Sequence, residues 1–258
     1  MTPTLKSGLL ATTIMCIGGM TAKAAAAQTC TPATFETNSY TVCSVETDKA
    51  ELRLFWKNGD GQPYRLFSSV AEAVTATGRK LAFAMNAGMY NTDFSPIGLY
   101  VEDGAELRKT DTSTVKKTTG PVPNFYKKPN GVFFLAAESA GILPTDVFLK
   151  RRREVRFATQ SGPILVSRNR VNPIFISGSA DHTRRSGVGI CGGDTIRFAI
   201  SDDRVNFHDF ARLFRDHLKC PDALFLDGGN GAGLYDPATN RNDWSWHGGY
   251  GPIVGLVE

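Results

Sequence analysis

The sequence predicts an α/β domain built from many short strands and few helices. Short apolar runs recur along the chain, and Gly, Asn or Asp residues typical of turns bound most of them. Helical periodicity is confined to residues 68–76 and 206–218, so strands supply most of the predicted core. With 258 residues, 41% of them hydrophobic, the chain is long enough for one substantial domain, which we expect to cover residues 28–258.

In the first half of the chain, the predicted strands are joined by tight turns. Residues 40–46 and 51–57 alternate apolar and polar side chains, and turn residues follow at 58–61, which indicates an edge of antiparallel sheet. Ser68 is the expected N-cap of a short helix that ends at Gly78. Further strands are predicted at residues 81–85 and 96–101.

The second half begins with a polar segment, residues 110–130. A loop of this length inside a compact domain is often a lid or a binding loop. Asn206 is the expected cap of the second helix, whose apolar side chains recur at helical spacing up to Leu218. The remaining strands are predicted at residues 130–135, 157–166 with a turn inside, 172–177, 186–190, 195–200 and 223–226.

The first 27 residues have the pattern of a secretory signal peptide. Lys6 precedes an apolar run, and an alanine-rich stretch suited to cleavage follows it. The run is short for a bilayer span, so we expect an exported protein, periplasmic or secreted, without stable membrane insertion after cleavage. Bulky Ile14 and Met15 before Cys16 argue against a lipoprotein signal. Removing Lys6 and Lys23 lowers the formal net charge from +4 to +2, so no partner chosen by bulk charge, nucleic acid included, is predicted.

Four cysteines remain after the predicted cleavage, and an even number in an exported chain favours disulfides. Of the three connectivities, we favour Cys30 with Cys43, which are close in sequence, and Cys191 with Cys220, which lie at the edges of predicted elements. A zinc site is the weaker alternative, because there is no Cys-x-x-Cys pair and no His at ligand spacing from a cysteine. We therefore expect neither a metal ion nor another cofactor.

Residues 224–233 combine a buried strand, a carboxylate and a glycine-rich turn. The apolar run ends at Asp227, and Gly228, Gly229 and Asn230 follow it. Glycines let a ligand approach the backbone N–H groups closely. A Walker loop is excluded because no lysine follows Asp227, and a dinucleotide fingerprint is excluded because the remaining chain is short and poor in helix formers. A turn that only joins two strands remains the alternative.

Other predicted strand ends also place polar side chains beside small residues. These residues are Asn86, Gly88, Asn130, Gln160, Ser161 and Gly162. A nucleophile of the α/β-hydrolase type is not supported at Ser161, because the flanking Gly-x-Ser-x-Gly pattern is absent. Each of these segments taken alone is also explained by a glycine turn.

A histidine and two arginines, His182, Arg184 and Arg185, precede the strand predicted at 186–190. A guanidinium group donates two parallel hydrogen bonds to phosphate or carboxylate, so these residues are candidates for an anion site. The basic run at residues 150–153 is more typical of a solvated face than of a site for anionic polymers.

The order of five motifs resembles that of the phosphodiester glycosidase family, whose animal members remove N-acetylglucosamine from phosphodiester-capped glycans. The motifs are Asn86-Ala87-Gly88-Met89-Tyr90, Asn130-Gly131-Val132-Phe133, Gln160-Ser161-Gly162-Pro163, Arg185-Ser186-Gly187-Val188-Gly189 and Leu226-Asp227-Gly228-Gly229. The resemblance runs from about residue 81 onwards, although the family commonly has Asp-Gly-Gly-Gly-Ser where this chain has Asp-Gly-Gly-Asn-Gly. It implies a mixed, largely antiparallel sheet whose strand ends meet at one pocket, and hydrolysis between sugar C1 and the phosphate oxygen of a sugar-1-phosphodiester.

The resemblance also implies roles for individual residues. Asp227 would act at the sugar carbon, as nucleophile or as base for water, while Arg185, with Arg184 or His182, would stabilise the departing phosphate. Because phosphate is a weak base, a strong general acid is less necessary than in an ordinary glycosidase. The residues expected to contact the substrate, a phosphorylated carbohydrate or envelope glycan, are Asn86, Gly88, Asn130, Gln160, Ser161, Gly162, His182, Gly228, Gly229 and Asn230. The candidates for a second acid are Asp93, Glu102 and Asp181.

Two further functions stay open at this point. One is a non-catalytic protein that binds an envelope polysaccharide or exopolysaccharide, with Arg185 and the glycines after Asp227 as a phosphate cradle. The other is a phosphodiesterase that attacks phosphorus instead of the sugar carbon.

Overall fold

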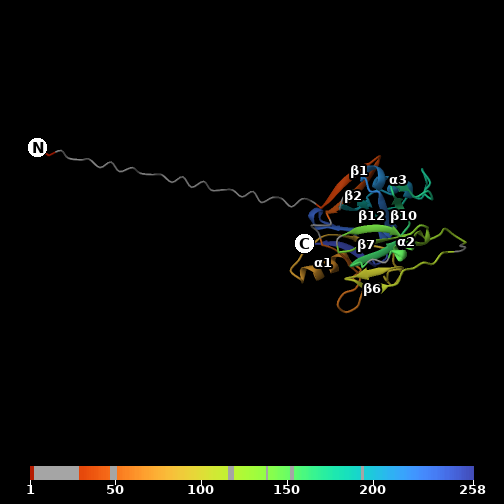
Figure 1. The fold of residues 1–258 in the computed structure, drawn as a ribbon, viewed down its shortest axis with the longest axis horizontal. Coiled ribbons are helices and arrows are strands. Elements are labelled where there is room, and N and C mark those ends of the chain that lie inside the picture. The colour runs from red at the N-terminus through yellow and green to blue at the C-terminus, as the bar shows by residue number, and fades with distance from the viewer. Residues whose placement is uncertain (3–28, 47–50, 116–118, 138, 152–153, 193–194) are drawn as a thin grey trace.

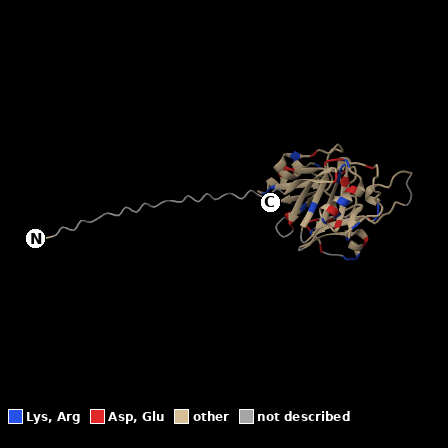
Figure 2. Cartoon of the chain, turned by 90° about the horizontal axis from the view of Figure 1, so that it is seen from above, with Lys and Arg blue, Asp and Glu red and all other residues tan. Residues whose placement is uncertain are grey.

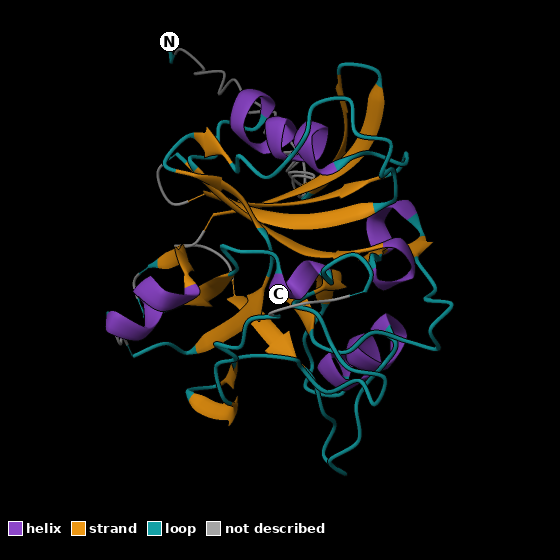
Figure 3. Cartoon of the chain, turned by 90° about the vertical axis from the view of Figure 1, so that its right-hand side faces the viewer, coloured by secondary structure: helices purple, strands orange, loops and turns teal. Residues whose placement is uncertain are grey.

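The structure is a computed structural model, and it describes residues 1–2, 29–46, 51–115, 119–137, 139–151, 154–192 and 195–258 (Figure 1). The predicted signal peptide therefore lies almost entirely outside the described residues. In Figure 1, β1 and β2 lie at one end of the folded body and β6 lies at the other. Figure 3 shows that the strands form the centre of the body and that the helices lie around them.

The described strands form three sheets, and every strand pairing recorded among them is antiparallel. The seven-stranded sheet has the order β1 (Cys30–Phe35), β2 (Asn38–Glu46), β13 (Thr195–Ser201), β12 (Arg185–Cys191), β14 (Asp222–Gly228), β10 (Ile164–Ser167) and β11 (Arg170–Val171). One five-stranded sheet has the order β16 (Arg241–Asn242), β15 (Leu234–Asp236), β4 (Leu81–Asn86), β17 (Ile253–Val257) and β3 (Glu51–Phe55). The other has the order β6 (Ala105–Arg108), β5 (Tyr100–Glu102), β9 (Phe157–Ser161), β7 (Gly131–Leu135) and β8 (Ala140–Pro144).

The described helices are short. They are α1 (Phe67–Thr75), α2 (Thr145–Lys150), α3 (Phe207–Arg212), a π-helical turn at Leu213–His217, and 3-10 turns at Asn124–Tyr126, Gly229–Gly231 and Pro237–Thr239. The predicted fold, largely antiparallel sheet with few helices, is confirmed. Its division among three sheets was not predicted.

The main hydrophobic core lies where the three sheets meet. Phe198 of β13 has its ring centroid 5.6 Å from that of Phe83 on β4 and 5.9 Å from that of Phe133 on β7. One side chain thus contacts all three sheets, so burial of these rings holds the sheets together.

A second cluster packs α3 against the seven-stranded sheet, and glycines on β12 make this packing close. A Cβ atom on Gly187 would lie 3.1 Å from the rings of Phe210 and Phe214, and one on Gly189 would lie 2.7 Å from Phe214. Part of the Arg-Ser-Gly-Val-Gly motif is therefore explained by helix packing and not by ligand contact.

Both predicted disulfides are confirmed. Cys30–Cys43 joins β1 to β2, and Cys191–Cys220 joins the end of β12 to the residues before β14. Cys191–Cys220 thus ties β12 to the entry of β14, the two strands that carry the motifs around Arg185 and Asp227, and each disulfide restricts the unfolded chain.

Some predicted boundaries were wrong. The strand predicted at 172–177 is a turn, because Pro173 has no N–H to donate and the Asn172 side chain accepts from the N–H of Ile174 and donates to Ile164 O. The strand predicted at 96–101 begins only at Tyr100. The first helix begins at Phe67, and its N-cap residue Leu66 makes no side-chain capping bond, so Ser68 is inside the helix.

Charged residues of both signs are interspersed on the described chain (Figure 2). Within the basic run at 150–153, Lys150 and Arg151 are exposed, and the other two positions are outside the described residues. None of the described helices is long and apolar enough to cross a membrane.

Candidate active site

Asp227 lies at the end of β14, directly before the 3-10 turn Gly229–Gly231. Ser186 on β12 is its cross-strand partner, and Arg185 is paired with Gly228. The ladder contains a β-bulge here, since Ser186 pairs with Asp227 while Gly187 pairs with Phe225, which leaves Leu226 as the extra residue. Bulges re-aim side chains and are frequent beside active sites.

The carbonyl freed by the bulge is bonded from another sheet. Ser161 Oγ, at the end of β9, donates to Leu226 O over 2.7 Å and is fully buried. Ser161 was predicted to contact the substrate, and the structure places it beneath the strand that carries Asp227.

A second set of buried polar groups fixes the backbone of Asp227. Ser186 Oγ accepts from Asp227 N over 3.2 Å and donates to Asp227 O over 3.1 Å. Asn86, at the end of β4, donates from Nδ2 to Ser186 Oγ over 2.8 Å and accepts from Gly233 N over 3.0 Å. With 1% of its surface exposed, Asn86 ties together two sheets and the turn after Asp227.

The carboxyl group of Asp227 is partly buried and close to backbone on two sides. Its Oδ1 accepts from Gly228 N over 2.8 Å. A Cβ atom on Gly231 would lie 2.3 Å from Oδ2, so only glycine fits at that position. In the described part of the chain no Lys, Arg or His nitrogen comes within salt-bridge distance of this carboxylate. Burial raises the pKa of Asp227 to about 7, and the Gly228 hydrogen bond opposes that rise.

Tyr90 forms one side of the site. Burial raises the pKa of Tyr90 to about 12, the negative charge of Asp227 adds to the rise, and a hydrogen bond with Ser245 opposes it. Its hydroxyl donates to Gly249 O over 3.0 Å, and its ring lies against Gly251. The loop that follows β4 and the loop that precedes β17 therefore meet beside Asp227.

Arg184 links this second loop to the turn after Asp227. Its carbonyl accepts from Gly229 N over 2.8 Å, and its guanidinium pairs with Asp243 Oδ2 at 2.5 Å. Asp243 also pairs with Arg241 at 3.0 Å. Arginine neighbours and hydrogen bonds outweigh burial and hold the pKa of Asp243 below its usual value, so this carboxylate is a charged anchor for the loop.

The Arg185 side chain points away from Asp227, toward Val205, Asp181 and Phe207. Its side chain is 1% exposed, its Nε donates to Val205 O over 2.8 Å, and one terminal nitrogen donates to Asp181 O over 2.9 Å. The guanidinium carbon lies 3.7 Å from the ring centroid of Phe207. Burial lowers the pKa of Arg185 to about 10, with Asp181 opposing the shift, so the group is cationic at neutral pH. These bonds place Arg185 behind the loop residues it holds rather than on an open surface.

The other predicted contact residues divide into buried and exposed groups. Gln160 accepts from Leu99 N and Asp111 N and donates to Asp111 O, so it anchors the start of the polar segment at 110–130. Asn130 donates to Phe125 O near the end of that segment. Buried with these two are Gly88, whose Cβ would lie 2.4 Å from Gln160 O, and Gly162, whose Cβ would lie 2.5 Å from Asn130 Cβ.

Four predicted contact residues keep access to solvent. Gly228 and Gly229 are half-buried, while His182 and Asn230 are exposed. The candidate second acids are engaged elsewhere: Asp93 accepts from Ser95, Glu102 from Tyr100, and Asp181 pairs with Arg185. Within the described residues, no group of three or more His, Cys, Asp or Glu is arranged to hold a metal ion.

The sequence patterns did not indicate Tyr90, Ser186, Gly231 or Asp243 as site residues. Tyr90 and Ser186 belong to recognised motifs, but only Asn86 and Arg185 of those motifs were predicted to be site residues. Successive side chains of a strand point to opposite faces, so Ser186 and Arg185 were expected to point in opposite directions. This alternation was the sequence signal that could have identified Ser186.

Comparisons with known proteins identify relatives in sequence. A family model described as phosphodiester glycosidase matches residues 79–249. An uncharacterized Escherichia coli K12 protein, YigE, is 30% identical over 195 residues, which cover 76% of this chain and 72% of that protein.

Solved structures show a similar fold. The catalytic domain of zebrafish N-acetylglucosamine-1-phosphodiester alpha-N-acetylglucosaminidase, auto-inhibited by its pro-peptide, matches with a TM-score of 0.60 at 15% identity, over 88% of this chain and 81% of that one. A Burkholderia pseudomallei protein described as exported matches with a TM-score of 0.52 at 12% identity, over 85% of this chain and 74% of that one. At these identities the likeness concerns the fold.

Proposed function

The chain belongs to the phosphodiester glycosidase family, and on this basis we propose that it hydrolyses a sugar-1-phosphodiester with Asp227 as the group that acts at the sugar carbon. In this reaction the oxygen of water bonds to sugar C1, and the bond between C1 and the phosphate oxygen breaks. The electron pair leaves with the phosphate, so the products are a free sugar and a phosphomonoester.

The observation that carries the proposal is the environment of Asp227. A carboxyl group with a pKa of about 7, at a strand end and beside a glycine turn, is suited to accept a proton near neutral pH. We assign it the role of general base for the attacking water. Departing phosphate is a weak base, so this assignment needs no partner carboxylic acid.

The two sides of Asp227 suggest how a substrate lies. We place the sugar on the side formed by Tyr90 and the loop at 243–251, and the phosphate on the side formed by residues 181–185. Arg185 is then a positioning residue, because its side chain holds Asp181 and Val205 by their carbonyls while its backbone is paired with Gly228.

We further propose that the protein is exported, periplasmic or secreted, and acts on an envelope or secreted glycan. Two disulfides and the signal-like N-terminal sequence support this location. An N-acetylglucosamine-like sugar is proposed from the named activity of the zebrafish relative.

The test is turnover of methyl N-acetylglucosamine-1-phosphodiester by the wild type and by Asp227→Asn, with Asp60→Asn in an exposed turn as the matched control. We expect turnover by the wild type and the control, and its loss in Asp227→Asn. In water labelled with ¹⁸O, the label should enter the sugar. Label in the phosphate would identify attack on phosphorus, and binding without turnover in the wild type would identify a non-catalytic glycan-binding protein.

A further inference from the structure

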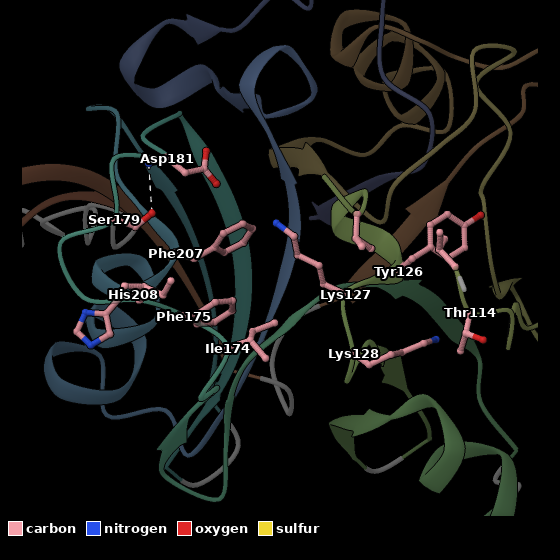
Figure 4. A pocket seen from close by; sticks show the side chains of 13 residues that line it. Thr114, Tyr126, Lys127, Lys128, Ile174, Phe175, Ser179, Asp181, Phe207 and His208 are labelled. Carbon is pink, nitrogen blue, oxygen red and sulfur yellow. Dashed lines mark hydrogen bonds between the residues drawn. The ribbon is translucent and has the colours of Figure 1, made fainter. Parts of the chain in front are cut away.

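A groove of about 560 Å³ lies between α3 and the segment that precedes β7 (Figure 4). Phe207 and His208 of α3 and the turn at Phe175 line one wall, and Tyr126 and Lys127 line the other. Its volume is in the range of roughly 300–1,000 Å³ that is common for small-molecule sites. Neither the sequence motifs nor the family assignment gives this groove an occupant.

The inner end of the groove has an excess of positive charge. Lys127 Nζ lies 5.1 Å from the ring centroid of Phe207, the ring that also covers Arg185 at 3.7 Å. Asp181 lines the groove and is the carboxylate that faces both cations. Two cations against one carboxylate favour an anionic group at this end. Lys127 Nζ also donates to the neutral Asn124 amide oxygen, which leaves its charge in place, whereas the carboxylates of Asp111 and Asp146 are near Lys128, so we do not count the charge of Lys128.

The outer end is apolar. Ile174 and Ile176 line it with 45% and 73% of their surfaces exposed, and Val122 faces the same space. Phe175 is stacked on Phe207 at 5.0 Å, so the aromatic floor is continuous between the two ends. Exposed isoleucines beside a concave aromatic surface are typical of a binding site for an apolar group.

The groove is connected to Asp227 through residues 181–185. Asp181 is in its lining, and the Thr183 side chain lies beside Gly228 and Gly229. Arg185, which bonds to Asp181, is the strand partner of Gly228. With the phosphate on the side of residues 181–185, as proposed above, this segment leads from the turn after Asp227 to the groove.

Resting on the function proposed above, we propose that this Lys127 groove binds the leaving half of the substrate, the phosphomonoester of an alcohol with an apolar body. The phosphate lies at the Lys127 end and the apolar body lies against Ile174 and Ile176. Cleavage of the diester adds a negative charge to the phosphate, and Lys127 attracts that charge. The groove thus selects the alcohol, while the Tyr90 side selects the sugar.

Binding of octyl phosphate, a mimic of the leaving half, tests the groove without turnover. We expect Lys127→Met and Ile176→Asp each to weaken its Kd by about tenfold, the size expected for loss of one charge-assisted or apolar contact. Lys57→Met is the matched control, because Lys57 also lies over an aromatic ring, at 4.3 Å from Trp56, but is outside the groove lining. Equal weakening by all three variants, or no weakening by either groove variant, overturns the proposal.

Turnover separates this proposal from the proposed function. The measured quantity is the ratio of kcat/KM for the octyl and methyl esters of N-acetylglucosamine-1-phosphate. We expect the wild type to prefer the octyl ester and Ile176→Asp to bring the ratio toward one. If both esters are turned over and the ratio is unchanged in Ile176→Asp, the groove proposal alone is wrong. If neither ester is turned over, the proposed function is wrong, and the octyl phosphate measurement then decides on the groove. Equal affinity for octyl phosphate and octyl glucoside would contradict the anionic end.

Discussion

The hydroxyl of Ser161 reaches from β9 to the carbonyl of Leu226 on β14, one residue before Asp227, over 2.7 Å. Leu226 is the extra residue of the bulge, so its carbonyl has no ladder partner on β12. One side chain from a different sheet therefore stabilises the irregular strand end on which the candidate base is placed.

Replacing Ser161 should weaken this strand end. Ser161→Ala leaves a buried carbonyl without its donor, which costs about 1–3 kcal/mol of unfolding free energy. We expect kcat to fall as well, because the carboxylate of Asp227 loses its fixed position. Urea unfolding and steady-state kinetics measure the two effects. Ser44→Ala, at an exposed position on β2, should change stability by less than about 0.5 kcal/mol, and full activity in Ser161→Ala would contradict the positioning role.

The activity should depend on the protonation of Asp227. A base accepts a proton only as carboxylate, and its pKa is about 7, so kcat/KM should rise with pH through about 7 and level off above it. The pH profile of kcat/KM measures this. A profile that falls through the same region would show instead that the protonated acid is the active form.

The same pKa predicts an effect of pH on stability. The folded state keeps a proton on Asp227 up to about pH 7, whereas the unfolded chain releases it near pH 4. Stability from this group is therefore complete below the unfolded pKa and is lost as the pH rises through the folded value. Asp227→Asn should be more stable than the wild type at pH 8, by on the order of a few kcal/mol, and the difference should disappear near pH 4. Thermal unfolding of both proteins at the two pH values measures it, and a constant difference would refute it.

Gly231 should tolerate no side chain. A methyl group there would overlap Asp227 Oδ2, so Gly231→Ala has to displace the carboxylate. A displacement of about 1 Å in a catalytic group can cost roughly 100-fold in rate. Gly59→Ala is the matched control, since no atom lies within 4 Å of its added Cβ. Comparable kcat values in the two variants would mean that the carboxylate position is not critical.

The sequence was sufficient to predict the largely antiparallel fold, both disulfides and the position of Asp227 at a strand end. The short strands, the disulfides and the strand end at Asp227 depend on local apolar runs, turn residues and cysteine spacing, whereas the largely antiparallel sheet was implied by the resemblance to the family. The burial of Asn86, Asn130, Gln160 and Ser161 was not predictable in this way, because each bonds to a segment distant in sequence.

The direction of the Arg185 side chain was not predictable, because the apolar run at residues 223–226 does not indicate the β-bulge at Leu226. The bulge at Leu226 shifts the alternation of β14 against β12, so counting along either strand does not give the side to which its neighbours point. Asn172 and Pro173, by contrast, argue against a strand at 172–177 from sequence alone, since proline and asparagine favour turns.

The position of β17 has a consequence for the order of folding. This last strand of the chain lies in the middle of its sheet, between β4 and β3, and Val257 is paired with Glu51. β2 is likewise paired with a strand distant in sequence, β13, with Tyr40 opposite Ser201. Contacts between such distant residues give a high contact order, which slows folding, because β4 and β3 have no shared partner until β17 is in place between them.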